Sequence, residues 1–193
     1  MMTPASNGAE DIFGPNASSV MTLTRRLEEI PWYSAAWDPS ARRQAEHDVL
    51  AFAKQFGLQD FAFHWLTREE LNGFIARLDL TDDSLWHHLF HLPEQVKTRA
   101  EQTNRTAYVT AAADLVPERI FHAAFDGAFS AFKDEGNALS YAVGTALFVG
   151  GVATGWEIVA DESADPNPLL ALLPVLELGY WPIGLFDNKF YLI

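Results

Sequence analysis

Residues 137–156 read NALSYAVGTALFVGGVATGW, twenty consecutive positions without a charged side chain. A helix of this length would span the hydrocarbon core of a bilayer. However, the stretch also holds four glycines and several hydroxyl or amide side chains, and acidic rather than basic residues flank it,. We therefore predict a helix buried at the centre of a mainly helical protein, where the glycines let neighbouring helices approach closely. A membrane-spanning helix is the alternative.

The residues before this stretch predict a second long helix that packs against the first. Pro117 is expected to begin it, because proline is well accommodated in the first turn of a helix, and Gly136 is expected to end it. Between them, apolar residues recur at three- and four-residue spacing, which is typical of a helix face turned toward the core. This stripe consists of Ile120, Phe121, Ala124, Phe125, Ala128, Phe129 and Phe132. Two long antiparallel helices joined by a short turn are therefore expected.

Capping residues mark shorter helices on the N-terminal side of this pair. The sequence predicts helices over about 23–30, from Asp38-Pro39 to about Phe56, after a capping box of Thr67 and Glu70, and from Pro93 to Thr103,. Together with the two long helices, they predict a multi-helix, bundle-like arrangement.

A leucine-rich helix and a β-hairpin are predicted downstream. Asn167 and the proline after it favour a helix start, and Pro174 is expected to kink or split that helix. Two apolar runs then flank Asp187-Asn188, a pair that tolerates the positive φ angles of a tight turn,. We predict a β-hairpin over about 183–193. The predicted fold class is thus mainly α, with a small C-terminal hairpin.

The chain is expected to divide into a leader and one domain. Residues 1–20 are polar and rich in small side chains, which predicts a disordered leader, and residues 21–193 are predicted to form a single helical domain,. The leader lacks the basic and apolar regions of a secretory signal. Because the chain also contains no cysteine, we expect a cytoplasmic protein,.

The charge of the chain limits its partners. It carries 26 acidic and 13 basic residues, for a net charge of −13. This charge repels nucleic-acid phosphates and anionic membrane surfaces, so neither is an expected partner. Residues 134–193 hold eight acids and a single base, Lys189. A basic protein partner fits this charge, and a solvated acidic face is the simpler interpretation.

One group of residues has the spacing of metal ligands. Asp83, His87 and His91 follow one another at four-residue intervals, which places them on one face of a helix,. Two imidazoles and a carboxylate can bind a divalent metal ion. The HExxH motif is absent, however, because His88 follows His87. The polar face of a solvated helix is the alternative, as is a surface whose charge changes near neutral pH.

Aromatic residues cluster at two places outside the long helices. Tyr180 and Trp181 lie at the junction between the leucine-rich helix and the hairpin, and Trp32 and Trp37 lie in a loop. Either pair could fill the core or form an exposed anchor for a partner. We regard all four as candidate partner-binding residues.

The sequence contains no recognised catalytic motif. It has no GxSxG nucleophile elbow, no phosphate-binding loop and no dinucleotide-binding glycine pattern,. We therefore expect a non-catalytic binding or regulatory protein without a cofactor, for example an inhibitor or immunity-type protein that neutralises a basic partner. The alternative is a metal-dependent enzyme that uses Asp83, His87, His91 and a divalent metal ion. A homo-oligomer formed through the hairpin edge or the glycine-rich helix is a third expectation.

Overall fold

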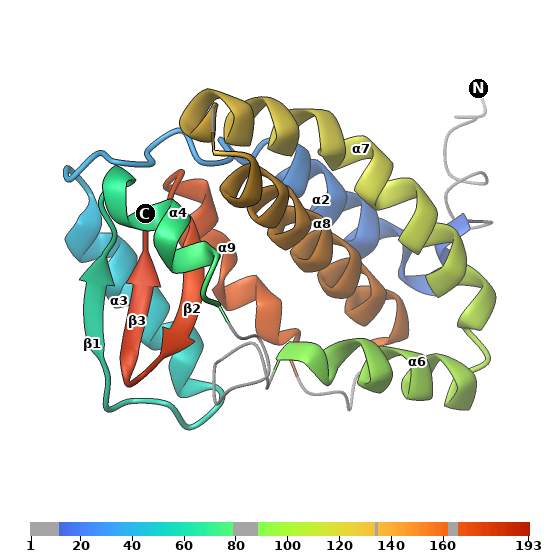
Figure 1. Cartoon of the computed structure of the whole chain (residues 1–193). Coiled ribbons are helices and arrows are strands. Elements are labelled where there is room, and N and C mark those ends of the chain that lie inside the picture. The colour runs from blue at the N-terminus through green and yellow to red at the C-terminus, as the bar shows by residue number, and fades with distance from the viewer. Residues whose placement is uncertain (1–11, 79–88, 134, 162–165) are drawn as a thin grey trace.

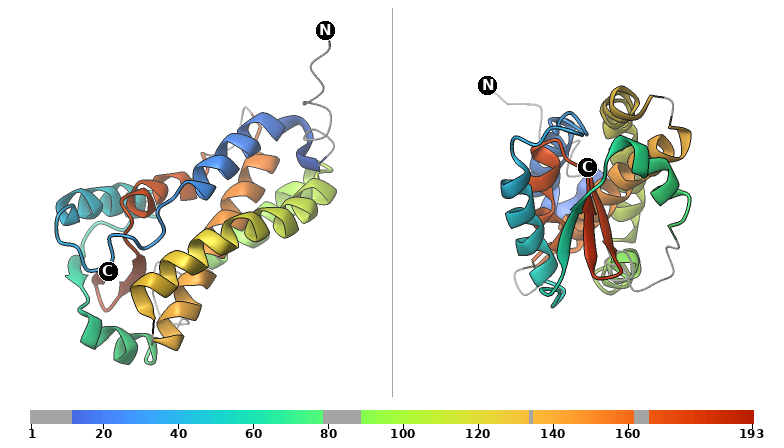
Figure 2. Two further views of the ribbon diagram at one scale, coloured as in Figure 1. Left: turned by 90° about the horizontal axis from the view of Figure 1, so that it is seen from above. Right: turned by 60° about the vertical axis from the view of Figure 1, so that its left-hand side comes forward.

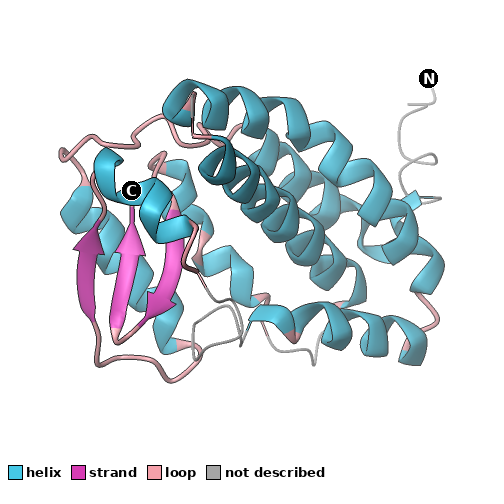
Figure 3. Ribbon diagram, in the orientation of Figure 1, coloured by secondary structure: helices cyan, strands magenta, loops and turns pink. Residues whose placement is uncertain are grey.

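Two long antiparallel helices form the centre of the protein (Figure 1). The computed structural model describes residues 12–78, 89–133, 135–161 and 166–193. Helix α7 spans Thr106–Phe132 and helix α8 spans Gly136–Val159, which confirms the predicted pair of long helices joined by a short turn. Helix α7 lies on the outside of the molecule, other helices pack around α8, and a small sheet lies at one end (Figure 3).

Helix α8 is buried in the middle of the bundle. It is long and apolar enough to cross a membrane by length and composition, but most of its apolar window is covered by the rest of the protein. Its small residues explain the close packing: a Cβ atom added at Gly150 would clash with Ile120 on α7, and one at Gly155 would lie 2.9 Å from Val96. The burial of α8 supports the prediction of a central core helix in a soluble fold.

Helix α7 begins eleven residues earlier than predicted. Pro117 lies inside the helix rather than at its start. A proline in this position removes one intrahelical hydrogen bond to the carbonyl four residues before it. That carbonyl belongs to Ala113, which is exposed and therefore accessible to water. The alanine-rich residues on the N-terminal side of Pro117 favour the helix enough for it to continue through the proline.

The predicted disordered leader is wrong for residues 12–20. Gly14–Asn16 form the short helix η1 and Ala17–Glu28 form helix α2, with Phe13 and Val20 buried. The side chain of Asn16 donates hydrogen bonds to three carbonyl oxygens at the end of α8, the closest at 2.8 Å. Arg105 donates to two of the same carbonyls. These contacts cap the C-terminal end of α8, which explains why the segment is ordered.

Helices α6 and α4 pack against the long pair, and α3 packs against the C-terminal helices instead. Helix α6 (Leu92–Gln102) begins at a proline as predicted and packs across α7 and α8. Helix α4 (Arg68–Ile75) begins with the predicted capping box of Thr67 and Glu70. Helix α3 (Arg42–Lys54) starts later than predicted, because the side chain of Asp38 accepts a hydrogen bond from the amide of Ser40 instead of capping the helix.

The leucine-rich segment is split as Pro174 predicted. Pro168–Ala171 form the short helix η2, which the side chain of Asn167 caps through the amide of Leu169. Leu173–Glu177 form helix α9, with the second proline in its first turn. Both pieces pack against α3.

The C-terminal residues form part of a three-stranded sheet rather than an isolated hairpin. Strands β2 (Pro182–Phe186) and β3 (Lys189–Leu192) pair antiparallel, and Asp187 and Asn188 between them both have positive φ angles. Strand β1 (Ala62–Trp65), which the sequence did not predict, pairs parallel with β3. The order β1-β3-β2 places β3 in the middle of the sheet.

One continuous hydrophobic core joins the helices to the sheet. Seen from above, the helices extend away from the sheet, and helix η1, near the start of the described residues, lies at the opposite end of the molecule from the C-terminus (Figure 2). No element of the described residues covers one long side of α7, where Phe121, Phe125 and Phe129 are exposed.

Candidate binding surface

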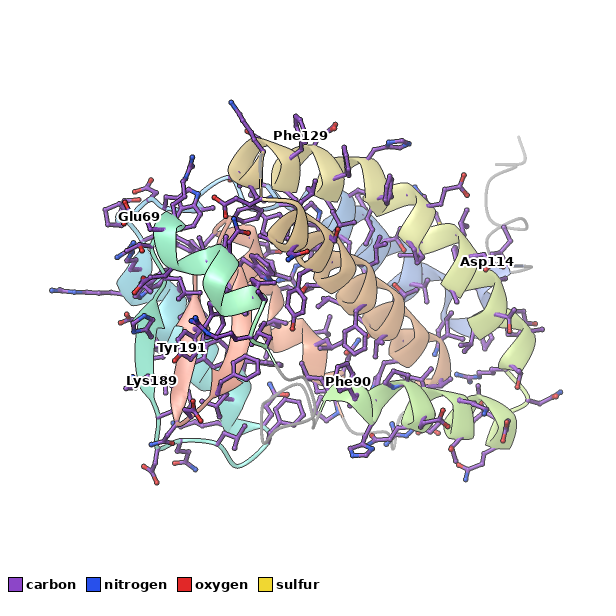
Figure 4. The ribbon with its side chains drawn as sticks, in the orientation of Figure 1. Glu69, Phe90, Asp114, Phe129, Lys189 and Tyr191 are labelled. Atoms are coloured by element: carbon purple, nitrogen blue, oxygen red, sulfur yellow. The ribbon has the colours of Figure 1, made fainter. Side chains whose placement is uncertain are left out.

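Three phenylalanine rings stack along the outer side of α7. Phe121, Phe125 and Phe129 are 38%, 37% and 50% exposed. The rings of Phe121 and Phe125 are 5.8 Å apart at an interplanar angle of 22°, and those of Phe125 and Phe129 are 6.0 Å apart at 13°. Figure 4 shows Phe129 projecting from the molecule on this side. We call these three residues the phenylalanine ladder.

The ladder corrects the predicted core stripe of α7. Four residues of the predicted stripe face inward, and two buried residues nearer the start of the helix extend this inner face. The buried residues of α7 are Ala112, Val116, Ile120, Ala124, Ala128 and Phe132. Most of these side chains are small, so α7 lies close to α8. On a neighbouring face, a Cβ atom at Gly127 would clash with the carbonyl oxygen of Trp32. No room remains on these faces for further large rings, and the three phenylalanines therefore point outward.

Acidic side chains lie beside the ladder. Asp114, Glu118 and Asp126 are exposed and lie three or seven residues from the ladder's rings, which places them on the adjoining face of the helix,. We call these three residues the acidic row. None of the three forms an ion pair within the part of the chain that the structure describes. The surface therefore combines exposed aromatic rings with carboxylates that are free to meet a partner.

Basic residues on α7 do not neutralise the acidic row. Arg119 is directed toward α2, where its Nε atom lies 2.6 Å from Oε1 of Glu28. Lys133 is exposed and follows the last residue of α7, past the end of the ladder.

Acidic residues of the C-terminal third have structural partners instead. Glu157 accepts hydrogen bonds from Ser19 and Asn167, and so joins α8 to α2 and to η2. Glu177 forms a bidentate ion pair with Arg26. These two carboxylates hold elements together, so they do not contribute to a free acidic face.

The predicted metal ligands are not brought together among the described residues. Asp83 and His87 lie outside those residues. His91 is exposed at the N-cap of α6, where it borders a cleft of about 520 Å³ together with Phe56 and Trp156. Among the residues that the structure describes, no group of three or more histidine, aspartate or glutamate side chains could hold a metal ion.

Three of the four predicted aromatic anchors are buried. Tyr180, Trp181 and Trp32 are 0%, 0% and 2% exposed, so they fill the core and offer no surface to a partner. The ring of Trp181 lies within 6 Å of the rings of Tyr33, Phe132 and Tyr141, contributed by a loop and both long helices. Trp37, the fourth, is half-buried.

Two buried tyrosines near Trp181 have altered acidity. The hydroxyl of Tyr33 donates a hydrogen bond of 2.6 Å to the carbonyl oxygen of Ala142 on α8. Complete burial raises the pKa of Tyr33 well above its ordinary value. Partial burial raises the pKa of Tyr141 to about 12. Neither effect could be predicted from the sequence, because both depend on packing between distant segments.

Comparison of the chain with protein-family models, with curated proteins and with solved structures finds no match.

Proposed function

We propose that this protein is a non-catalytic binding or regulatory protein that holds a basic protein partner against the outer side of α7. The observation that carries the proposal is the phenylalanine ladder beside the unpaired acidic row. Aromatic residues, phenylalanine included, are enriched in the cores of protein interfaces. Carboxylates at the edge of such a patch select and steer a positively charged partner.

The shape of the surface suits an amphipathic helix. From Asp114 to Phe129 the face runs along about 22 Å of helix, or roughly four turns. A partner helix with apolar residues at four-residue intervals and a neighbouring row of lysine or arginine would match both the ladder and the acidic row. Such a partner would bury the rings and pair the carboxylates at the same time.

Charge favours a basic partner over a second copy of this chain. Each copy carries a net charge of −13. Two copies meeting through this face would bring their acidic rows into the same interface, and like charges placed together weaken binding. An inhibitor or immunity-type protein, which covers a basic surface of its target in the cytoplasm, fits the same features.

A designed peptide provides the first test. The probe is an 18-residue helical peptide with leucines at four-residue intervals and a flanking row of lysines, labelled for fluorescence anisotropy. We expect saturable binding that weakens as salt is raised, because salt screens the attraction between exposed charges. A variant with Phe121→Ser, Phe125→Ser and Phe129→Ser should lose the binding.

Two variants that change the net charge equally distinguish the effect of the acidic row on peptide binding from the effect of net charge. Asp114→Asn, Glu118→Gln and Asp126→Asn remove three carboxylates from α7. The control Asp60→Asn, Glu69→Gln and Asp187→Asn removes three exposed carboxylates elsewhere. We expect the first variant to bind the peptide more weakly and the control to bind as the parent does. Equal losses in both variants would show attraction by net charge alone and would overturn the proposal.

Light scattering tests whether a second copy of this chain, instead of a basic protein, binds to the ladder. We expect a monomer at micromolar concentration. A concentration-dependent dimer that disappears in the triple phenylalanine variant would assign the ladder to a second copy of this chain and would refute a basic partner.

A further inference from the structure

A cleft of about 330 Å³ lies where the loop after α2 meets the start of α4. Two arginines and two tryptophans contribute most of its walls: the lining residues are Trp37, Arg42, Trp65, Leu66, Thr67 and Arg68. This combination is unusual in a chain that has twice as many acidic as basic residues.

Each arginine is placed over an aromatic ring. The guanidinium carbon of Arg42 lies 4.7 Å from the ring centroid of Trp65, and that of Arg68 lies 5.3 Å from the ring centroid of Trp37. A guanidinium that stacks on a ring uses its flat face for that contact. Its N–H donors point outward in the plane, where they can bind an oxyanion through paired hydrogen bonds.

Neither arginine has a carboxylate partner within the described part of the chain. The Nε atom of Arg42 is buried and has no hydrogen-bond acceptor there. The two guanidinium groups are therefore not neutralised by carboxylates of the described chain.

The surrounding contacts hold the cleft in this form. Glu46 accepts a 2.7 Å hydrogen bond from the indole nitrogen of Trp65 and so fixes that ring, without pairing with Arg42. Trp37 has a φ angle of 78°, a conformation that bulky residues rarely adopt, and its indole nitrogen donates to the carbonyl oxygen of Ala131 at 3.4 Å. Strained residues of this kind concentrate at ligand sites.

We propose that this cleft binds a small molecule that carries a phosphate group next to a flat ring. Two guanidinium groups offer more donors than a single carboxylate can accept, whereas the three terminal oxygens of a phosphate can use them. The volume exceeds that of phosphate alone, which leaves room for an aromatic ring beside the two tryptophans. The site is separate from the phenylalanine ladder.

Titration with phenyl phosphate and with inorganic phosphate tests the assignment. Binding is followed by ¹⁵N NMR of the indole and arginine Nε–H groups, which report on Trp37, Trp65 and Arg42 directly. We expect saturable shifts of these signals with both probes, and tighter binding of phenyl phosphate because its ring contacts the tryptophans. The absence of saturable shifts at millimolar phenyl phosphate would overturn the proposal.

Arginine variants test whether phenyl phosphate binds in this cleft. Arg42→Gln and Arg68→Gln should each weaken phenyl phosphate binding by about tenfold, the loss expected for one charge-assisted hydrogen bond. Arg68 is exposed, so its variant leaves the core intact. The control Arg43→Gln removes an exposed guanidinium from the next position of α3 and should bind as the parent does. Unchanged binding in Arg68→Gln, or an equal loss in the control, would place the anion elsewhere and refute the site.

Discussion

The outer side of α7 and the Tyr180–Trp181 junction are both aromatic, yet they lie in opposite environments. On α7, three phenylalanine rings stack in contact with solvent. At the junction, Tyr180 and Trp181 are completely buried between the sheet and the helices. The helical periodicity assigned the phenylalanines to the core, and this was wrong. For the junction, the sequence left core filling and an exposed anchor as alternatives, and the structure shows core filling.

The difference teaches that burial depends on the neighbouring elements more than on the residue type. Helix α7 turns its small residues toward α8, because Gly150 and the alanines around it allow the two helices to lie close together. The junction instead lies where a loop, two helices and strand β3 converge, and large rings are needed to fill that space. The predictions below test this contrast, beginning with the largest effect.

Truncation of Trp181 should have the largest effect on stability. Trp181→Ala removes a completely buried ring and leaves a cavity among three other aromatic residues. We expect the free energy of unfolding to fall by about 3–5 kcal/mol, as measured by urea denaturation. A loss below about 1 kcal/mol, the value typical of an exposed site, would show that the junction is not part of the core.

Two glycines of α8 should respond in opposite directions. Gly150→Ala places a methyl group against Ile120, and we expect a destabilisation of about 1–3 kcal/mol from overpacking,. Gly144 is exposed, with no atom within 4 Å of an added Cβ. There, alanine should stabilise the helix by about 0.5–1 kcal/mol. Thermal or urea unfolding of both variants checks the pair, and a stabilising Gly150→Ala would contradict the close packing of α7 on α8.

Alkaline pH should weaken the fold through Tyr33. Its pKa is raised by burial in the folded protein, so above about pH 10 the unfolded chain releases the phenolic proton while the folded protein retains it,. The free energy of unfolding should therefore fall as pH rises past 10, by about 1.4 kcal/mol per pH unit for this group. Below that pH the group has no effect. Tyr33→Phe should show a shallower alkaline decline, and an unchanged slope would mean that this hydroxyl is not buried.

The ladder should contribute least to stability. Phe129 is half exposed, and Phe129→Ala should change the free energy of unfolding by about 0.5 kcal/mol or less,. The same substitution should weaken binding of the basic helical peptide. A destabilisation comparable with that of Trp181→Ala would show that Phe129 belongs to the hydrophobic core, and would contradict a docking surface on α7.

Much of the fold could be predicted from local patterns. Helix α8 followed from the twenty uncharged residues, α4 from its capping box, and the split between η2 and α9 from Pro174. The turn at Asp187-Asn188 followed from two residues that tolerate positive φ. In each case the deciding interactions lie within a few residues of one another.

The features that could not be predicted depend on distant segments. Strand β1 has only four residues and exists because β3 pairs with it from far along the chain. The order of residues 12–20 depends on Asn16 reaching the end of α8. The four-residue spacing of Phe121, Phe125 and Phe129 was visible in the sequence, but which side of α7 faces α8 was not. The arginine–tryptophan cleft likewise joins three separate segments.

The position of β3 in the middle of the sheet has a consequence for synthesis of the protein. Strand β1 leaves the ribosome about 130 residues before its partner, a delay of roughly 6–25 s at typical elongation rates,. During that interval the Ala62–Trp65 backbone has no strand beside it, and Phe61 and Phe63 lack the ring of Phe190 that later covers them. A chaperone that recognises extended apolar segments would therefore find its binding site on the nascent chain here, and lose it when β3 arrives.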